Sequence, residues 1–160
     1  MTEATESMIY EMAFRVRLYI ASKFSEDKRL TDLTEREALL LELIGTMGSP
    51  SISAIGNFYP QVSSSTISTT ITRLWKDKKL VDKKILPENQ RITTVNLTEK
   101  GRDVLAKIRK NHAAVFKTVT ASLGLSGKQS ESFQHILAHA IGHFDQILGL
   151  DLPQAGALPS

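Results

Sequence analysis

The chain has 160 residues, of which 41% are hydrophobic and 23% are charged, a size and composition that fit one globular domain with a buried core. It contains no cysteine, which excludes disulfide bonds, thiolate metal ligands and cysteine-based catalysis or redox sensing. The formal net charge is only +3, which by itself is too small to indicate a nucleic-acid partner.

No apolar run in the sequence approaches the length that a bilayer-spanning helix needs. The N-terminal residues, MTEATESMIYE, are acidic and polar, whereas a signal peptide begins with basic and then apolar residues. We therefore expect a soluble cytoplasmic protein with no membrane partner.

Two helices are predicted before the first proline. Apolar residues recur at steps of three and four between Met8 and Ile20, which is the spacing of one buried helical face and predicts a helix over residues 5–24. Further along, Thr34 and Glu37 have the spacing of a capping box. The leucines that follow continue a second helix, and a pair of glycines ends it.

A short helix and a hydroxyl-rich segment come next. Ser51 or Ser53 can cap the short helix, which ends before Pro60. The segment SSSTISTTITRLW disfavours a helix by composition, because β-branched residues lose rotamer freedom there and serine competes for backbone hydrogen bonds. Its isoleucines and leucine nevertheless recur at helical spacing, and Ser63 can cap them, so we predict a helix that shows hydroxyl groups outward. Such a conflict between local preference and pattern is expected at a functional site.

Beyond this helix the hydrophobic period changes to two residues. The segments LVDKKIL and RITTVNL alternate and are joined by the turn PENQ, which predicts a β-hairpin. Thr98 then caps a long helix that runs to about Leu123, and Ser126 caps a last helix with a heptad-like apolar stripe. The tail, residues 150–160, is rich in proline and low in charge, and we expect it to be loose or to lie as an arm on a neighbour.

The order of these elements is that of a winged helix-turn-helix, in which a short helix, a turn and an amphipathic helix are followed by a hairpin wing. The predicted fold is therefore mainly α with a small β-hairpin wing. Between residues 73 and 91 the chain has more than twice as many basic as acidic residues. A helix with outward hydroxyls fits the major groove, and lysines and arginines on the wing neutralise phosphates beside it.

Two segments resemble a known family. LVDKKILPENQRITTVNLTEKG, residues 80–101, is similar to the wing and following helix start of MarR-type transcriptional regulators, in which LVxRxxDPxDxRxxxVxLTxxG recurs. VSSSTISTTITRL resembles the recognition helix of that family, and the order of elements agrees from about residue 8 to 148. The resemblance implies an obligate homodimer that binds a palindromic operator in double-stranded DNA. It also implies a single MarR-like domain, 1–160, with a winged lobe at about 32–100 and long dimerisation helices at about 5–25 and 98–149.

The wing departs from the family pattern at its tip. Asn89 stands where the family usually has an Asp that orients Arg91 for the minor groove. Leu86 and Gln90 replace a usual Asp and a common Arg. We therefore expect modest direct base readout and a large phosphate contribution to affinity. The residues expected to contact DNA are Ser63, Ser64, Ser65, Thr66, Ser68, Thr69, Thr72, Arg73, Lys76, Lys83, Lys84, Asn89, Gln90 and Arg91.

Aromatic residues suggest a ligand pocket where the winged lobe meets the dimerisation helices. Met12, Tyr19, Phe58, Tyr59 and Trp75 are its candidate lining. Aromatic residues at helical spacing are more often ordinary core, and the pocket interpretation gains from the binding of aromatic anions in the resembling family.

A row of histidines lies on the last predicted helix. His135, His139 and His143 recur at steps of four, a spacing that can ligate zinc, and His112 on the preceding helix could supply a further ligand. No acidic residue or cysteine joins them locally, and they flank the apolar stripe. The main interpretation is therefore a polar helix edge near a dimer interface, without a bound metal.

These features predict a sequence-specific DNA-binding transcriptional regulator whose operator binding is modulated by a small aromatic effector. A repressor is the favoured form of this regulator. Two alternatives stay open: a winged-helix protein-interaction module that binds no operator, and a metal-responsive regulator that uses the helix histidines. The sequence has no nucleophile-base pairing, cofactor loop or acidic cluster of ligand spacing, so we expect neither an enzyme nor a cofactor.

Overall fold

A computed structural model describes residues 2–58 and 62–149. Its helices and its single hairpin confirm the predicted fold class, mainly α with a two-stranded wing. Tyr59 and the tail 150–160 lie outside the described residues. The elements are α1 (Glu3–Ser25), α2 (Lys28–Thr31), α3 (Glu35–Met47), α4 (Ile52–Asn57), α5 (Ser64–Lys76), β1 (Val81–Leu86), β2 (Asn89–Leu97), α6 (Glu99–Ser122) and α7 (Gly127–Leu148).

The short helix α2 is the one element that the sequence did not predict. Asp27 caps it by accepting a 2.9 Å hydrogen bond from the backbone N–H of Arg29. Its single apolar residue, Leu30, is buried in the core. A four-residue helix has one apolar position, so it produces no periodic pattern that could have indicated it.

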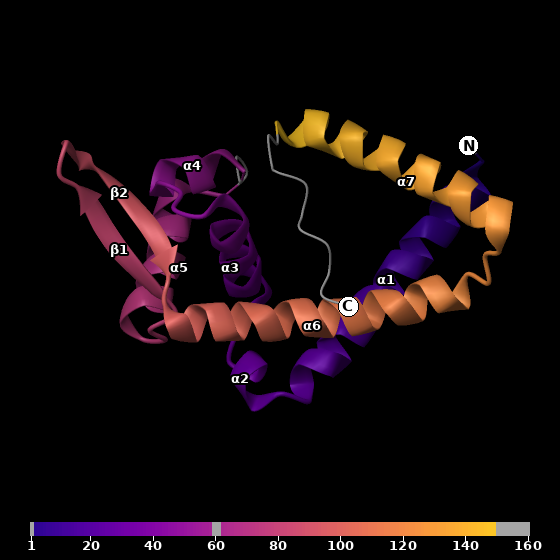
Figure 1. Ribbon diagram of the computed structural model, residues 1–160, viewed down its shortest axis with the longest axis horizontal. Coiled ribbons are helices and arrows are strands. Elements are labelled where there is room, and N and C mark those ends of the chain that lie inside the picture. The colour runs from indigo at the N-terminus through magenta and orange to yellow at the C-terminus, as the bar shows by residue number, and fades with distance from the viewer. Residues whose placement is uncertain (1, 59–61, 150–160) are drawn as a thin grey trace.

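The winged lobe forms one core around α3, α4, α5 and the hairpin, which gather at one end of α6 (Figure 1). The buried side chains come from α3, α4, the face of α5 that helical spacing predicted, the start of α6 and the inward positions of the strands. They include Leu40, Leu41, Ile44, Ile55, Ile67, Ile71, Leu74, Val81, Val95 and Ile108. Burial of this apolar set is the main term that holds α5 in place despite its poor helix propensity.

The segment LTEKG, residues 97–101, forms the junction between the wing and α6. Thr98 caps α6 by accepting a hydrogen bond from the Gly101 N–H, and its own N–H donates to the Leu80 carbonyl at 3.0 Å. A Cβ added to Gly101 would lie 1.9 Å from that carbonyl oxygen. Only glycine therefore allows α6 to approach the wing so closely. Lys79, the residue before this junction, has a positive φ of 58° at the end of the turn that follows α5.

The long helices α1 and α7 leave their apolar faces exposed in the single chain. α1 has no buried residue, and Met8, which the spacing placed on a buried face, is 72% exposed. α7 makes no extensive contact with the other described elements and stands apart from the winged lobe (Figure 1). Ile141 and Phe144 in its predicted stripe are each 60% exposed. Within residues 2–58 and 62–149, no helix is both long and apolar enough to cross a membrane.

Candidate nucleic-acid interface

The hydroxyl-rich segment forms helix α5, and its hydroxyl groups point outward as predicted. Ser63 caps the helix, since its side chain accepts a hydrogen bond from the Thr66 N–H. The one buried hydroxyl is that of Thr70, which donates to the Thr66 carbonyl at 2.8 Å. Ser65, Thr69 and Lys76 lie on the opposite, exposed side. Helix α5 therefore presents a polar face of small side chains that a DNA groove can approach closely.

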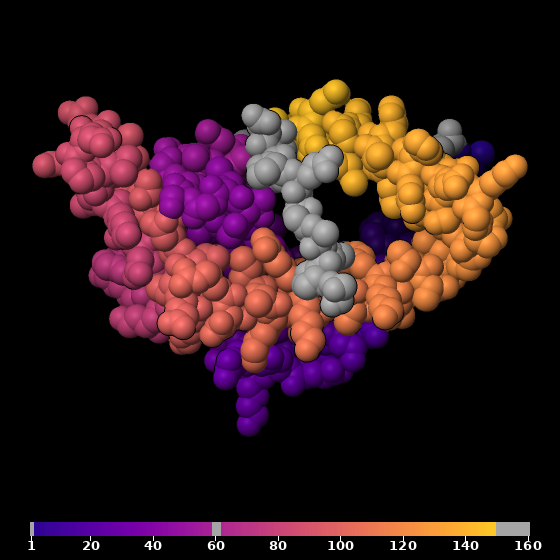
Figure 2. Space-filling view, in the orientation of Figure 1, coloured from indigo at the N-terminus to yellow at the C-terminus, as the bar shows by residue number. Residues whose placement is uncertain are grey.

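The wing tip carries all three residues that were predicted to contact DNA there. Strands β1 and β2 pair antiparallel, but the register shifts between the pairs Ile85↔Thr93 and Leu86↔Asn89, which leaves three residues of β2, 90 to 92, without a partner in the ladder. The Asn89 side chain accepts a hydrogen bond from the Arg91 N–H at 3.1 Å and so shapes the turn. The tip residues are exposed, and the hairpin projects from one end of the molecule (Figure 2).

Helix α5 and the wing are joined by a cluster around Trp75. The Lys76 and Lys83 ammonium groups lie 5.4 and 5.2 Å from the centre of the indole ring. The Lys83 Nζ also donates to the Thr72 hydroxyl at 2.9 Å. Burial lowers the pKa of Lys83, and the positive charge of Lys76 lowers it further. The polar face of α5 and the basic side of β1 thus form one continuous surface.

Arg73, which was predicted to contact DNA, pairs with a residue of α3. Its Nε donates to a carboxylate oxygen of Glu37 at 2.8 Å, and Lys78 lies 3.6 Å from the other oxygen. Glu37 is fully buried and also accepts from the Thr34 N–H at 2.8 Å in the capping box. Burial raises the pKa of Glu37, but these hydrogen bonds and the two positive charges outweigh it and hold the pKa below its ordinary value.

The sequence had predicted only the capping role of Glu37. Its partner Arg73 lies 36 positions further along the chain, and no local spacing indicates a pair so distant. Lys78 was likewise absent from the predicted site, although it stands within the basic run. Both basic residues therefore contribute to the seating of α5 on α3, and Arg73 keeps half of its side chain exposed toward solvent.

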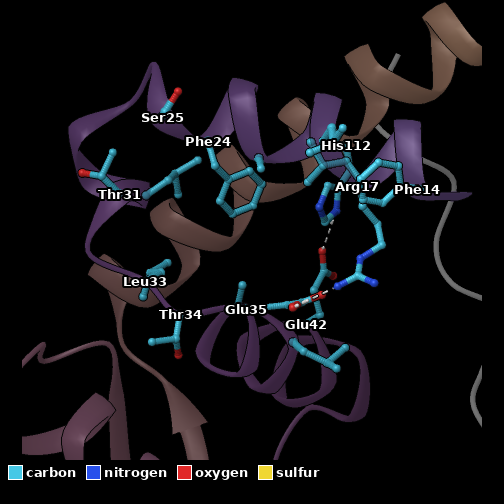
Figure 3. A pocket seen from close by; sticks show the side chains of 16 residues that line it. Phe14, Arg17, Phe24, Ser25, Thr31, Leu33, Thr34, Glu35, Glu42 and His112 are labelled. Atoms are coloured by element: carbon cyan, nitrogen blue, oxygen red, sulfur yellow. Dashed lines mark ion pairs between the residues drawn. The ribbon is translucent and has the colours of Figure 1, made fainter.

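A cavity of about 720 Å³ lies between α1, α2, α3 and α6. Its walls are mainly apolar, with Phe14, Phe24 and Leu39 among them, and Glu42 and His112 at its polar side are paired at 3.6 Å (Figure 3). Of the residues that were predicted to line a pocket, none of the four described ones lines this cavity. The fifth, at position 59, lies outside the described residues.

The predicted pocket residues lie elsewhere for physical reasons. Trp75 belongs to the α5 and wing cluster. Met12 precedes the part of α1 that lines the cavity, and Tyr19 lies within that part but is not one of the lining residues. The lining residues of α1, which include Phe14, Leu18 and Ala21, recur at helical spacing as the predicted set does. Helical spacing marks an apolar face, but it does not distinguish a face over a cavity from a neighbouring one.

The histidine row stands on the exposed surface of α7. His135, His139 and His143 are all solvent-exposed, and within residues 2–58 and 62–149 no group of three or more His, Asp or Glu side chains could hold a metal ion. His112 contacts Glu42 and lies over Phe24, with the ring centres 5.6 Å apart.

Residues 33–101 match the family model of the winged helix DNA-binding domain. This segment has the winged helix fold. Its fold is similar to that of MarR-like transcriptional regulators in solved structures, which confirms the fold that the sequence resemblance predicted. A comparison of the sequence with curated proteins found no match.

Three solved structures illustrate the likeness. The Streptococcus pneumoniae FabT structure, in complex with DNA, is 16% identical with a TM-score of 0.72, and the match covers 91% of this chain and 99% of that one. Apo wild-type MarR from E. coli is 15% identical with a TM-score of 0.66, covering 84% and 94%. A MarR-like transcriptional regulator from Thermotoga maritima is 19% identical with a TM-score of 0.62, covering 94% and 100%. The matches extend beyond the winged lobe and include long helices before and after it, as in these proteins.

Proposed function

We propose that the protein is a homodimeric, sequence-specific transcriptional regulator whose winged lobes bind a palindromic DNA operator. We propose further that it acts as a repressor. The observation that carries this proposal is the polar and basic surface formed by α5 and β1, from Ser65 through Thr72 to Lys83, together with the exposed wing tip at Arg91. The small hydroxyl side chains are suited to base edges, and the lysines are suited to phosphates. The FabT structure contains DNA, which supports the same partner for this fold.

The exposed apolar faces support the homodimer. In a monomer, α1 and α7 would leave Met8, Ile141 and Phe144 in water, each at least 60% exposed. Long helices whose apolar faces are exposed to water are uncommon on monomeric proteins, and such faces mark an interface. A second copy of the chain would cover them and place two winged domains in one particle. We propose one domain spanning residues 1–160 with a winged lobe at about 32–100, in a soluble cytoplasmic protein.

The cavity supports control by a small effector. Aromatic rings of Phe14, Phe24 and His112 line it, and a ligand of one or two rings would fit its volume of about 720 Å³. α1 and α6 form one wall, and α3 of the winged lobe forms another. A ligand that prefers a different separation of these walls would change the spacing of the two lobes, and so the affinity for two half-sites one helical turn apart.

The proposal is tested by fluorescence anisotropy with the DNA upstream of the protein's own gene and with a scrambled duplex, over a series of salt concentrations. We expect the native duplex to bind tighter by about a hundredfold or more, with a steep salt dependence. Equal and weak binding to both duplexes would contradict operator binding and leave a protein-interaction module as the better explanation. Addition of benzoate to the complex then tests whether an aromatic acid releases the DNA.

A further inference from the structure

Trp75 is the only tryptophan of the chain, and the structure places it at the surface of the winged domain. It lies in the last turn of α5, beside β1, and remains 36% exposed. Its neighbours Ile71 and Leu74 are fully buried. A large aromatic side chain left partly in water next to a buried core requires an explanation, since tryptophan is normally well buried.

The two charged groups that lie over the Trp75 ring are both positive. Lys76 and Lys83 approach the indole ring, and the ion pairs within residues 2–58 and 62–149 include neither of them. Burial lowers the pKa of Lys83, and repulsion from Lys76 lowers it further. An anion between the two ammonium groups would remove the repulsion and supply the missing countercharge. The cluster is therefore prepared for an anionic partner.

Its position in the fold indicates which anion. The cluster joins α5, the groove-facing helix, to the wing, through the hydrogen bond from Lys83 to Thr72. A duplex that takes α5 into its major groove and the wing into the adjacent minor groove has one phosphodiester strand between these grooves. That strand has to cross the junction where Trp75 lies.

Trp75 also offers a hydrogen-bond donor. The indole N–H has no partner among the hydrogen bonds of the described residues, and it can only donate. Two ammonium groups and one N–H from a rigid ring are the donors that a phosphate group accepts.

We propose that Trp75, Lys76 and Lys83 together bind one phosphate of the DNA strand between the two grooves. The inference rests on the proposed DNA binding and adds Trp75 to the contact surface. The indole ring holds both ammonium groups beside it by cation–π contact and donates its N–H to a phosphate oxygen. This contact is independent of base sequence, so it sets affinity and register while the hydroxyl face of α5 reads bases.

The first test uses the wild-type protein, because a single tryptophan makes its emission a direct report on this site. The protein is titrated with a mixed-sequence duplex of about 24 base pairs at about 50 mM salt, and tryptophan emission is recorded beside the anisotropy of the labelled DNA. We expect the emission to change and to saturate with the anisotropy, and salt to reverse both. Anisotropy that saturates without any change in emission would overturn the inference and leave DNA binding intact.

Variants separate the phosphate contact from a structural role. Lys83→Ala should lower the slope of log affinity against log salt by about 0.9 for each chain bound, and weaken binding by about eightfold per chain at 0.1 M salt. Trp75→Phe keeps a ring beneath the lysines but lacks the N–H, and we expect about tenfold weaker binding to native and scrambled duplexes alike. Lys110→Ala, on the exposed side of α6, removes the same charge and should leave the slope unchanged.

The outcomes distinguish failure of this inference from failure of the proposed function. If no duplex raises the anisotropy, the proposed function fails. If DNA binds but Lys83→Ala and Lys110→Ala behave alike, the phosphate site is wrong. Thermal unfolding of each variant shows whether a loss of binding arises from misfolding. The emission measurement uses the wild-type protein, so it tests the phosphate site whether or not the variants fold.

Discussion

The buried carboxylate of Glu37 should contribute to stability in a way that depends on pH. Glu37→Gln keeps the size of the side chain but removes its charge. It weakens two charge-assisted hydrogen bonds, from the Thr34 N–H and from the Arg73 guanidinium, each 2.8 Å long. A hydrogen bond to a charged group contributes about 1 kcal/mol more than a neutral one. Because Arg73 is half exposed, solvent screening reduces its share. We expect a loss of about 1.5 kcal/mol in the free energy of unfolding at pH 7.

The pH dependence follows from the direction of the pKa shift. The folded-state pKa of Glu37 lies below its ordinary value of 4.5, so the unfolded chain binds the proton more readily than the folded one. The stabilisation is therefore complete above the ordinary pKa and is lost as the pH falls through the lower, folded-state value. The difference between the wild type and Glu37→Gln should shrink over that range.

Urea unfolding followed by circular dichroism measures this difference, at one protein concentration because a dimer's stability depends on it. Glu35→Gln is the matched control, since Glu35 begins the same helix but its side chain is 85% exposed, 3.9 Å from Arg17. It should change stability by well under about 1 kcal/mol. Equal stabilities of wild type and Glu37→Gln at pH 7, with no convergence in acid, would refute the role assigned to Glu37.

The other predictions concern the wing junction, the DNA surface and the dimer. Gly101→Ala forces a Cβ toward the Leu80 carbonyl oxygen and should destabilise the fold by about 1–3 kcal/mol in urea unfolding, whereas Gly56→Ala meets only ordinary contacts and should be neutral or stabilising. Thr69→Ala should reduce the preference for the native over the scrambled duplex by roughly fivefold with an unchanged salt slope. Lys84→Ala should instead lower the slope and spare the preference. Phe144→Asp should convert the dimer to a monomer in light scattering after size exclusion, and Phe144→Leu should not.

The elements that the sequence predicted correctly are those with a repeated pattern. Ile67, Ile71 and Leu74 are buried on one face of α5 although the segment's composition disfavours a helix, because burial of that face outweighs weak helix propensity. The hairpin was found from its alternation and the caps at Ser63 and Thr98 from their position. Each of these signals is local in the sequence, and each is enforced by one hydrophobic core.

The site was harder to predict because its decisive contacts are not local. Arg73 looks like a groove residue in sequence, and only the fold brings it to the buried Glu37. Trp75 was predicted to line a ligand pocket, and only the pairing of β1 beside α5 brings Lys83 over its ring. In both cases a side chain was assigned from the sequence of its own helix, while its contacts in the fold come from another element.

Helix α3 supplies a physical route between the proposed effector and the proposed DNA surface. Glu42 on α3 lines the cavity and pairs with Arg109 of α6 at 3.2 Å and with His112 at 3.6 Å. On the same helix, Glu37 holds Arg73 of α5. A rigid helix transmits a displacement at one of these positions to the other, since packed interiors deform little. A ligand that separates Glu42 from α6 would therefore move α5 with α3, and the polar face of α5 would change its angle to the DNA.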